Sequence, residues 1–278
     1  MTATDRSERV RPLQSPFLVT ASTDRRGVSV GITADASTAV VEMAVHGPWS
    51  QHLGSQVAAG LRLCMAGPST SIIIDLHDVE DPHGVSQSFW AAAWRAARLA
   101  PTPVQLTLCL PTTTTLDKRL RHMHGQRPML FATMPESRIA AAGRLSRAPR
   151  LQVRLAPSPA SVRAARDLVA QACHTWHLPQ VHDAGLIMSE LASNAVEHAR
   201  TNFVVTVSRN DTRLYLAVRD GAMSFPHLSG PAASSQQASL NERGRGLQLV
   251  HATATAWGAM PTRGGKVVWA IVPSNSQL

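Results

Sequence analysis

The chain has 278 residues, of which 44% are hydrophobic and 16% are charged. A disordered chain carries fewer apolar and more charged residues, so this composition predicts a soluble globular protein long enough for two domains. No stretch approaches the roughly 20 apolar residues that cross a bilayer. The start of the chain, from Met1 to Pro16, lacks the apolar segment of a secretory signal. We therefore expect a cytoplasmic protein without a membrane partner.

The formal net charge of +9 raises nucleic acid as a partner, because clustered Lys and Arg neutralise phosphates. The arginines are scattered, with local concentrations at 6–11 and 138–154. No aromatic residues interleave with them as stacking platforms, and no helix-turn-helix pattern stands out. This favours a solvated basic surface, with an acidic protein partner or weak nucleic-acid contact as the alternative.

Cysteine and histidine do not form a metal-binding pattern in this sequence. Cys64, Cys109 and Cys173 are widely spaced and form no Cys-x-x-Cys pair. His122 and His124 lack further ligands at useful spacing. We expect the cysteines to be buried small hydrophobes and expect neither disulfides nor a zinc site.

Residues 1–26 mix Thr, Ser, Arg and Pro without periodicity and are expected to form a flexible tail. Strand-like and helix-like segments then alternate over residues 27–145, which predicts a mainly parallel sheet with helical cover. The expected strands are 28–32, 39–45, 71–76, 104–110 and 129–132. The expected helices are 51–65, 86–99 and 116–123.

This order, with Asp75 and Leu76 at the end of the third strand, resembles a STAS domain, the fold of anti-sigma-factor antagonists, over residues 27–143. In that family the loop after this strand carries Asp-Ser-Ser-Gly, whose first Ser accepts a phosphate. The matching positions here hold Asp81, Pro82, His83 and Gly84. Proline has no hydroxyl, so the resemblance implies an N-terminal α/β STAS-like domain without the usual phosphorylation switch.

Two further residues bear on this resemblance. Ser86 lies close to the loop but at the wrong place in the motif, so it is a weak candidate for a replacement phosphoacceptor. The turn from Gly47 to Ser50 also departs from the family, which has an acidic residue at its fourth position.

Between residues 144 and 160 the composition turns to Arg, Pro, Ser and Ala, which indicates a boundary, so a second domain is expected at 150–278. In this part of the chain, helices follow one another and strands follow one another, which predicts an α+β two-layer sandwich. The expected helices are one from 161, 181–199 and 247–256. The expected strands are 151–155, 203–208, 214–219 and 266–272.

Three sequence features of this second domain point to chemistry. Glu190 and Asn194 share one stripe of a predicted helix with Glu197, which taken alone indicates a solvated surface. Asp220 and Gly221 directly follow an apolar strand. A glycine-rich stretch then opens a helix, where bare backbone N–H groups and the helix dipole favour an anion. That stretch is Gly244, Arg245, Gly246 and Leu247.

Together these features resemble the GHKL (Bergerat-fold) ATPase family, in the branch of the anti-sigma-factor serine kinases, over residues 151–273. Glu190 and Asn194 match its N box, and Asp220 with Gly221 its adenine-binding box. The glycine-rich stretch matches its phosphate-binding box. The C-terminal pattern from Trp257 to Trp269 also looks like this branch.

The resemblance implies ATP and Mg²⁺ as cofactors and a role for each motif. Asn194 would offer its oxygen to Mg²⁺, and Glu190 would orient the attacking hydroxyl or take a proton from it. Asp220 would accept a hydrogen bond from adenine, next to Gly221. Backbone near Gly244 and Gly246, ahead of Leu247, would hold phosphates, and the side chains of Arg243 or Arg245 would offset their charge. The loop 228–241 is expected to act as a mobile lid.

Three further residues of this domain bear on the expected site. Ala222 stands where the family often has a second glycine, and its methyl group would narrow the adenine pocket. His198 could line the site, although a surface or packing histidine is at least as common. Lys266 is expected to be a charge at the edge of a strand.

The function implied by the two resemblances is an ATP-binding anti-sigma-type regulator, a serine/threonine kinase of a bacterial partner-switching pathway. Its partners would be a sigma factor or a STAS-type antagonist protein, with a homodimer as an open alternative. A non-catalytic module that sequesters such a partner when nucleotide is bound is the second hypothesis. A nucleic-acid-binding regulator that uses the arginines is the third.

Overall fold

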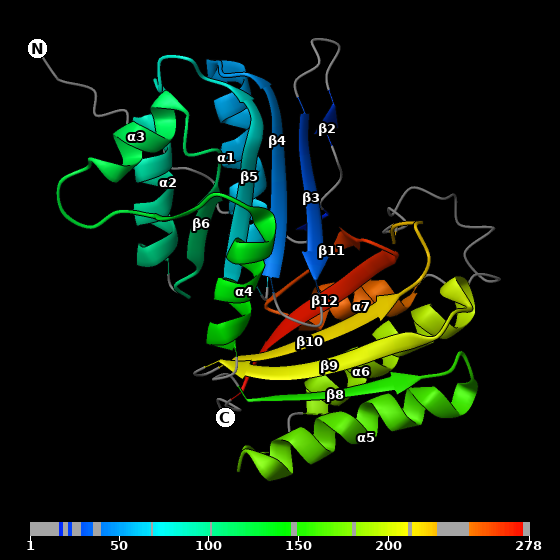
Figure 1. The fold of residues 1–278 in the computed structure, drawn as a ribbon. Helices are drawn as coiled ribbons and strands as arrows, with labels where there is room; N and C mark the ends of the chain where they lie inside the picture. The colour runs from blue at the N-terminus through cyan, green and yellow to red at the C-terminus, as the bar shows by residue number, and fades with distance from the viewer. Residues whose placement is uncertain are drawn as a thin grey trace, which may run out of the picture.

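The computed structural model describes residues 17–18, 22–23, 29–35, 40–67, 69–100, 102–145, 149–179, 182–210, 213–226 and 245–274. These residues form a mixed α/β structure with two six-stranded sheets, each carrying helices (Figure 1). Among them, no helix combines the length and the apolar character that a membrane span requires.

The first sheet has the order β2-β3-β4-β5-β6-β7. Its pairs β2–β3 and β3–β4 are antiparallel and the others are parallel, as the alternation of strands and helices predicts. The strands are Ser22–Thr23, Ser29–Asp35, Val40–Pro48, Ser71–Glu80, Gln105–Cys109 and Met129–Phe131. The helices that follow them are α1 (Gln51–Ala66), α2 (Gln87–Leu99), α3 (Thr115–Arg121) and α4 (Met134–Leu145).

The run of isoleucines in β5 is explained by helices on both faces of this sheet. Ile72 and Ile74 belong to the core that α1, α2 and α3 cover, whereas Ile73 packs with Ala141 of α4 on the other face. A strand that is buried on both sides has no need for alternating polar residues. The helix α4 was not predicted.

The loop before α2 is held by the carboxylate of Asp81. Its Oδ1 accepts a hydrogen bond from Val85 N (2.9 Å), and its Oδ2 accepts from Ser86 N (2.9 Å) and Ser86 Oγ (2.6 Å). Ser86 is fully buried, and its Oγ also accepts from Trp90 Nε1 (3.0 Å). The Ser86 hydroxyl is thus buried and engaged by the side chains of Asp81 and Trp90 in this structure.

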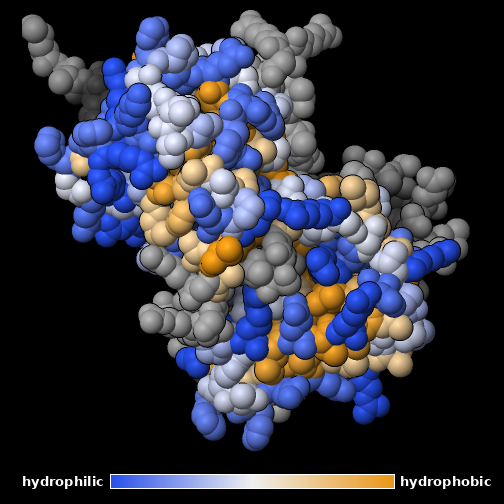
Figure 2. All heavy atoms as spheres, viewed as in Figure 1, coloured by the Kyte–Doolittle hydropathy of each residue, from blue (hydrophilic) through white to orange (hydrophobic). Residues whose placement is uncertain are grey.

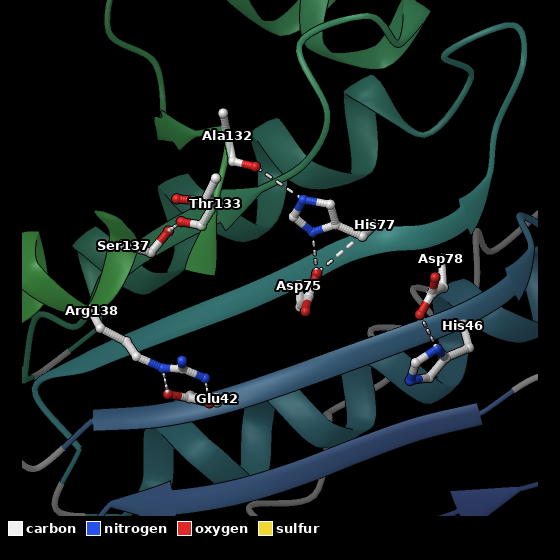
Figure 3. A network of polar contacts seen from close by, with 9 residues as sticks. All are labelled: Glu42, His46, Asp75, His77, Asp78, Ala132, Thr133, Ser137 and Arg138. Carbon is white, nitrogen blue, oxygen red and sulfur yellow. Dashed lines mark hydrogen bonds and ion pairs between the residues drawn. The ribbon is translucent and has the colours of Figure 1, made fainter. Parts of the chain in front are cut away.

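A second polar network ties β5 to the segment after β7 (Figure 3). The Nδ1 atom of His77 lies 2.6 Å from Asp75 Oδ1, and its Nε2 lies 3.0 Å from Ala132 O. When Asp75 is ionised, both partners act as acceptors, so this geometry favours the form of the ring with hydrogen on both nitrogens. Partial burial lowers the pKa of His77, but the hydrogen bonds to Asp75 and Ala132 outweigh it and raise the pKa above the usual value.

The second sheet has the order β1-β11-β12-β10-β9-β8, antiparallel except for the β1–β11 pair. Helices α5 (Pro159–Thr175), α6 (His182–Asn194) and α7 (Arg245–Thr253) cover one face, together with the short π-helix η1 (Ala195–Ala199). The strands in chain order are β1 (Phe17–Leu18), β8 (Arg150–Leu155), β9 (Phe203–Asn210), β10 (Arg213–Asp220), β11 (Ala256–Thr262) and β12 (Gly265–Pro273).

The other face of β11 and β12 packs against the N-terminal half. Along β12, alternate side chains enter two different cores. Val268, Ala270 and Val272 pack with the helices, and their neighbours on the opposite side pack with α1 and the first sheet. Those neighbours are Val267, Trp269 and Ile271, joined by Tyr215 and Met260. A hydrophobic core therefore continues from one sheet to the other.

Several sequence expectations need correction. The segment 1–26 was expected to be a flexible tail, but β1 and β2 lie in it and pair with β11 and β3; its first 16 residues lie outside the described residues. The helix expected at 247–256 spans Arg245–Thr253 and is followed by the unpredicted strand β11. The helix expected at 181–199 changes to a π-helix after Asn194.

The expectation for the cysteines is confirmed. Cys64, Cys109 and Cys173 are free and buried, and burial raises the pKa of the Cys64 thiol to about 12. No cluster of His, Cys, Asp or Glu that could hold a metal ion occurs among the described residues, so His122 and His124 gain no further ligands there.

The hairpin between β11 and β12 supplies a stability test with a matched control. Gly265 has a φ of 147°, and a Cβ at this position would overlap the backbone oxygen of Asp220. Gly264, its neighbour, has nothing within 4 Å of such a Cβ. We expect Gly265→Ala to lower the free energy of unfolding by about 3 kcal/mol or more, and Gly264→Ala to change it by less than about 0.5 kcal/mol, in urea denaturation. Equal effects would contradict this backbone contact.

Candidate functional site

The first element of the site is the meeting of α6 and α7 at Glu190. The Glu190 carboxylate lies directly against Gly246, because a Cβ on that glycine would overlap Glu190 Oε2. Glycine in the first turn of α7 therefore makes room for the acid. Partial burial raises the pKa of Glu190, and the charge of Glu197 adds to this shift. A carboxylate with a raised pKa next to a helix N-terminus is the type of group that serves as an acid or base.

Asn194, one turn further along, ends α6. Its Nδ2 atom is buried and has no hydrogen-bond partner among the described residues. Because the two ends of an amide are assigned rather than observed, the oxygen can equally occupy this position. The following residues form η1, and π-helical turns often occur at functional sites. A buried amide end without a protein partner is suited to a ligand.

The second element is a buried ion pair between β10 and β12. Asp220 and Lys266 are 5% and 6% exposed, and Lys266 Nζ lies 2.9 Å from Asp220 Oδ1. The backbone N–H of Ala222 donates to the same oxygen at 2.8 Å. The expectation that Lys266 is an edge charge is wrong, because strands β10 and β12 pair Asp220 with Lys266 directly. Nothing in the local sequence indicates this partner.

The other carboxylate oxygen of Asp220 has a different environment. Asp220 Oδ2 accepts no hydrogen bond from any residue that the structure describes. An ionised carboxylate has lone pairs on both oxygens, so Oδ2 can still accept a donor from a ligand. Oδ1 is fixed by two protein donors, which orients the carboxyl plane.

Thr201 connects the two elements. It follows η1, and its Oγ1 accepts a hydrogen bond from Gly221 N at 2.9 Å. A Cβ on Gly221 would lie 3.2 Å from Thr201 Cγ2, so a glycine is favoured at this close approach. The sequence reasoning did not find Thr201. Its contact brings the end of β10 beside the segment that leaves the helix of Glu190 and Asn194.

Of the remaining predicted site residues, only some lie in the part of the chain that the structure describes. Leu247 packs partly buried against the core under the helices. Arg245 is the first residue of α7, and its side chain is not described. Arg243, Gly244 and the expected lid at 228–241 lie outside the described residues. His198 is exposed, as expected for a surface histidine.

The Lys266–Asp220 pair gives a double-mutant test. We expect Lys266→Met to reduce stability by about 3–5 kcal/mol, because it leaves a buried carboxylate without its partner. In the Asp220→Asn/Lys266→Met double variant the loss should be smaller than in Lys266→Met alone, since no buried charge remains. Urea denaturation of the four proteins measures both values. Strictly additive losses would show that the two groups do not interact.

Residues 155–272 match the family model of the histidine kinase-like ATPase domain. An anti-sigma factor antagonist from Mycobacterium paratuberculosis has 14% sequence identity and a TM-score of 0.33, over 43% of this chain and 98% of that chain. The RsbU and RsbW domains of a Mycobacterium tuberculosis protein have 18% identity and a TM-score of 0.33, over 46% of this chain and 34% of that chain. No curated protein matches the sequence.

The family match runs from the end of β8 to the end of β12 and so includes every described residue of the site. Glu190, Asn194, Asp220 and Gly246 all lie within it. The part of the chain at 155–272 is therefore a histidine kinase-like ATPase domain, the GHKL type that its motifs resemble.

Proposed function

We propose that this protein binds Mg·ATP in its C-terminal half and phosphorylates a Ser or Thr of a protein partner in a bacterial partner-switching pathway. The observation that carries the proposal is the Glu190 carboxylate lying against Gly246 at the start of α7. This places a proton acceptor beside a helix N-terminus, where phosphate groups bind favourably. The proposed units are the STAS-like part at 27–145 and the ATP-binding part at 150–278.

The residues of the site fit both cofactors. Asn194 has a buried amide end without a protein partner, which suits an oxygen ligand of Mg²⁺. Asp220 keeps one carboxylate oxygen without a protein donor, which suits the amino group of adenine. When bound, Mg²⁺ neutralises charge on the phosphates during transfer.

The protein side chains would contribute positioning and proton transfer. Glu190 would accept the proton of the attacking hydroxyl, and its raised pKa strengthens it as a base. Lys266 and the Ala222 N–H would hold Asp220 in one orientation. We propose that the side chains of Arg243 and Arg245 offset the phosphate charge. The backbone around Gly244, Gly246 and Leu247 would hold the phosphate groups.

A non-catalytic role is the second candidate, and the N-terminal half favours it. Pro82 occupies the position of the expected phosphoacceptor, and the Ser86 hydroxyl is buried between Asp81 and Trp90. The chain therefore lacks the usual substrate hydroxyl in this half. In this alternative the protein sequesters a sigma factor or a STAS-type antagonist when nucleotide is bound, without phosphoryl transfer.

Labelled ATP and candidate STAS proteins separate the two functions. We expect Glu190→Gln to reduce phosphoryl transfer by about a hundredfold or more, because proton transfer to a base is lost. It should keep the rise in melting temperature caused by Mg·ATP, since Asn194 and Asp220 remain. Glu197→Gln, a nearby exposed carboxylate, is the control and should keep both. Nucleotide binding by the wild type with no transfer to any partner would establish the non-catalytic role.

The pH dependence of transfer tests Glu190 as the base. The base must be ionised, and burial followed by the charge of Glu197 raises its pKa above 4.5. Transfer should therefore fall as the pH decreases through this raised pKa. In Glu197→Gln the midpoint should move to lower pH but stay above 4.5, because burial remains the larger cause. A pH–rate profile under single-turnover conditions measures the midpoint, and an identical midpoint in both proteins would exclude this assignment.

A further inference from the structure

A cleft of about 350 Å³ lies between the two halves of the chain, on the other side of β10 from the Asp220 site. Its walls come from β3, β4 and α4 on one side and from β10 and the β11–β12 hairpin on the other. Small-molecule sites begin at about this size. Figure 2 shows strongly hydrophilic side chains where the upper and lower halves meet. None of the site residues described above lines the cleft.

The described lining of the cleft carries an excess of positive charge. Its charged side chains are Arg138, Arg219 and Arg263 and a single carboxylate, Glu42. Arg138 binds Glu42 through two contacts, Nε–Oε1 at 2.6 Å and Nη2–Oε2 at 2.8 Å (Figure 3). The hydrogen bond from Arg138 lowers the pKa of Glu42, so this carboxyl is ionised at neutral pH. The described lining thus holds three guanidinium groups and one carboxylate, and Arg138 and Arg263 contact that carboxylate.

The positive charges of Arg219 and Arg263 are incompletely neutralised by the described residues. Arg263 reaches the same Glu42 Oε2 at 3.3 Å, across the boundary between the halves. Arg219 has no hydrogen bond or ion pair with any residue that the structure describes. A guanidinium group presents five N–H donors in a fork that matches phosphate geometry. Arg219 and Arg263 therefore offer donors to an anion in the cleft.

We propose that this cleft binds a small phosphomonoester, with the phosphate dianion held by Arg219 and Arg263. The apolar part of the wall, Ala34 and Val40, is suited to the organic part of the ligand. Two net positive charges among the described lining side chains match the charge of one phosphate dianion. The ligand class follows from this charge and from the cleft volume, independently of the nucleotide site.

The cleft is joined to the Asp220 site by two elements. On β10, Arg219 and Asp220 are consecutive residues, so their side chains point to opposite faces of the sheet. On the β11–β12 hairpin, Arg263 contacts Glu42 in the cleft, and Lys266 contacts Asp220 on the other face. A variant of Arg219 consequently separates binding in the cleft from binding at the nucleotide site.

Calorimetric titration of the full chain with inorganic phosphate and with glycerol 3-phosphate, at constant ionic strength, tests the proposal. We expect dissociation constants on the order of 1 mM. Arg219→Gln should weaken binding of both anions about tenfold, because a charge-assisted hydrogen bond is lost. Arg163→Gln, on the surface of α5, is the matched control and should bind as the wild type does.

A second variant is expected to change the affinity for phosphate in the opposite direction. Glu42→Gln removes the carboxylate that competes for Arg138 and Arg263, so it should strengthen phosphate binding several-fold, which a misfolded protein cannot do. If neither anion produces a heat of binding, the proposal is overturned. Equal binding by the wild type and Arg219→Gln also overturns it, because the anion would then bind elsewhere. Weaker binding by a Glu42→Gln protein that melts as the wild type does also overturns it.

Discussion

The structure depends on the burial of β12 on both faces. Every residue of this strand from Gly265 to Val272 is buried, and its backbone is paired with β10 on one side and β11 on the other. Its side chains then enter two cores in strict alternation. Close packing makes both cores sensitive to any shift of this strand. The N-terminal half and the ATPase-like domain are thereby tied together, and β12 contributes side chains to the cores of both.

This arrangement limits where other proteins can bind. The outer face of β11 and β12 is occupied by α1 and the first sheet, and Gly67 at the end of α1 approaches Met260 so closely that a Cβ would lie 2.9 Å from its Cε. A second copy of the chain therefore cannot use this part of the sheet for a homodimer while the contact exists. A sigma factor or antagonist, as the proposed partner, would have to contact other surfaces.

The sequence predicted the features that depend only on residues close together in the chain. Glu190 and Asn194 share a helix face because of the helical period, and Asp220 ends an alternating strand, so both could be placed without a structure. The pairing of Lys266 with Asp220 could not be predicted, because the two residues are 46 positions apart and meet only through the register of β10 and β12.

The strand β11 contains Gly258 and Pro261 and has no alternating pattern, so its formation depends on pairing with β12. Strands of two residues, such as β1 and β2, are too short to show a period.

The missed lysine bears on nucleotide selectivity in the proposed function. Lys266 and the Ala222 N–H both donate to Asp220 Oδ1. The proposed ligand would therefore meet Oδ2, which as part of an ionised carboxylate can accept a hydrogen bond but cannot donate one. The amino group of adenine supplies the donor that this oxygen requires. Guanine would bring a carbonyl oxygen to the same place, leaving two acceptors opposed and a buried charge without its hydrogen bond. A site that holds a buried acceptor for a ligand donor rejects the analogue without that donor far more strongly than a hydrophobic pocket rejects a missing methylene. In the proposed function the ion pair would therefore contribute to selectivity for adenine, because it keeps Asp220 a fixed acceptor.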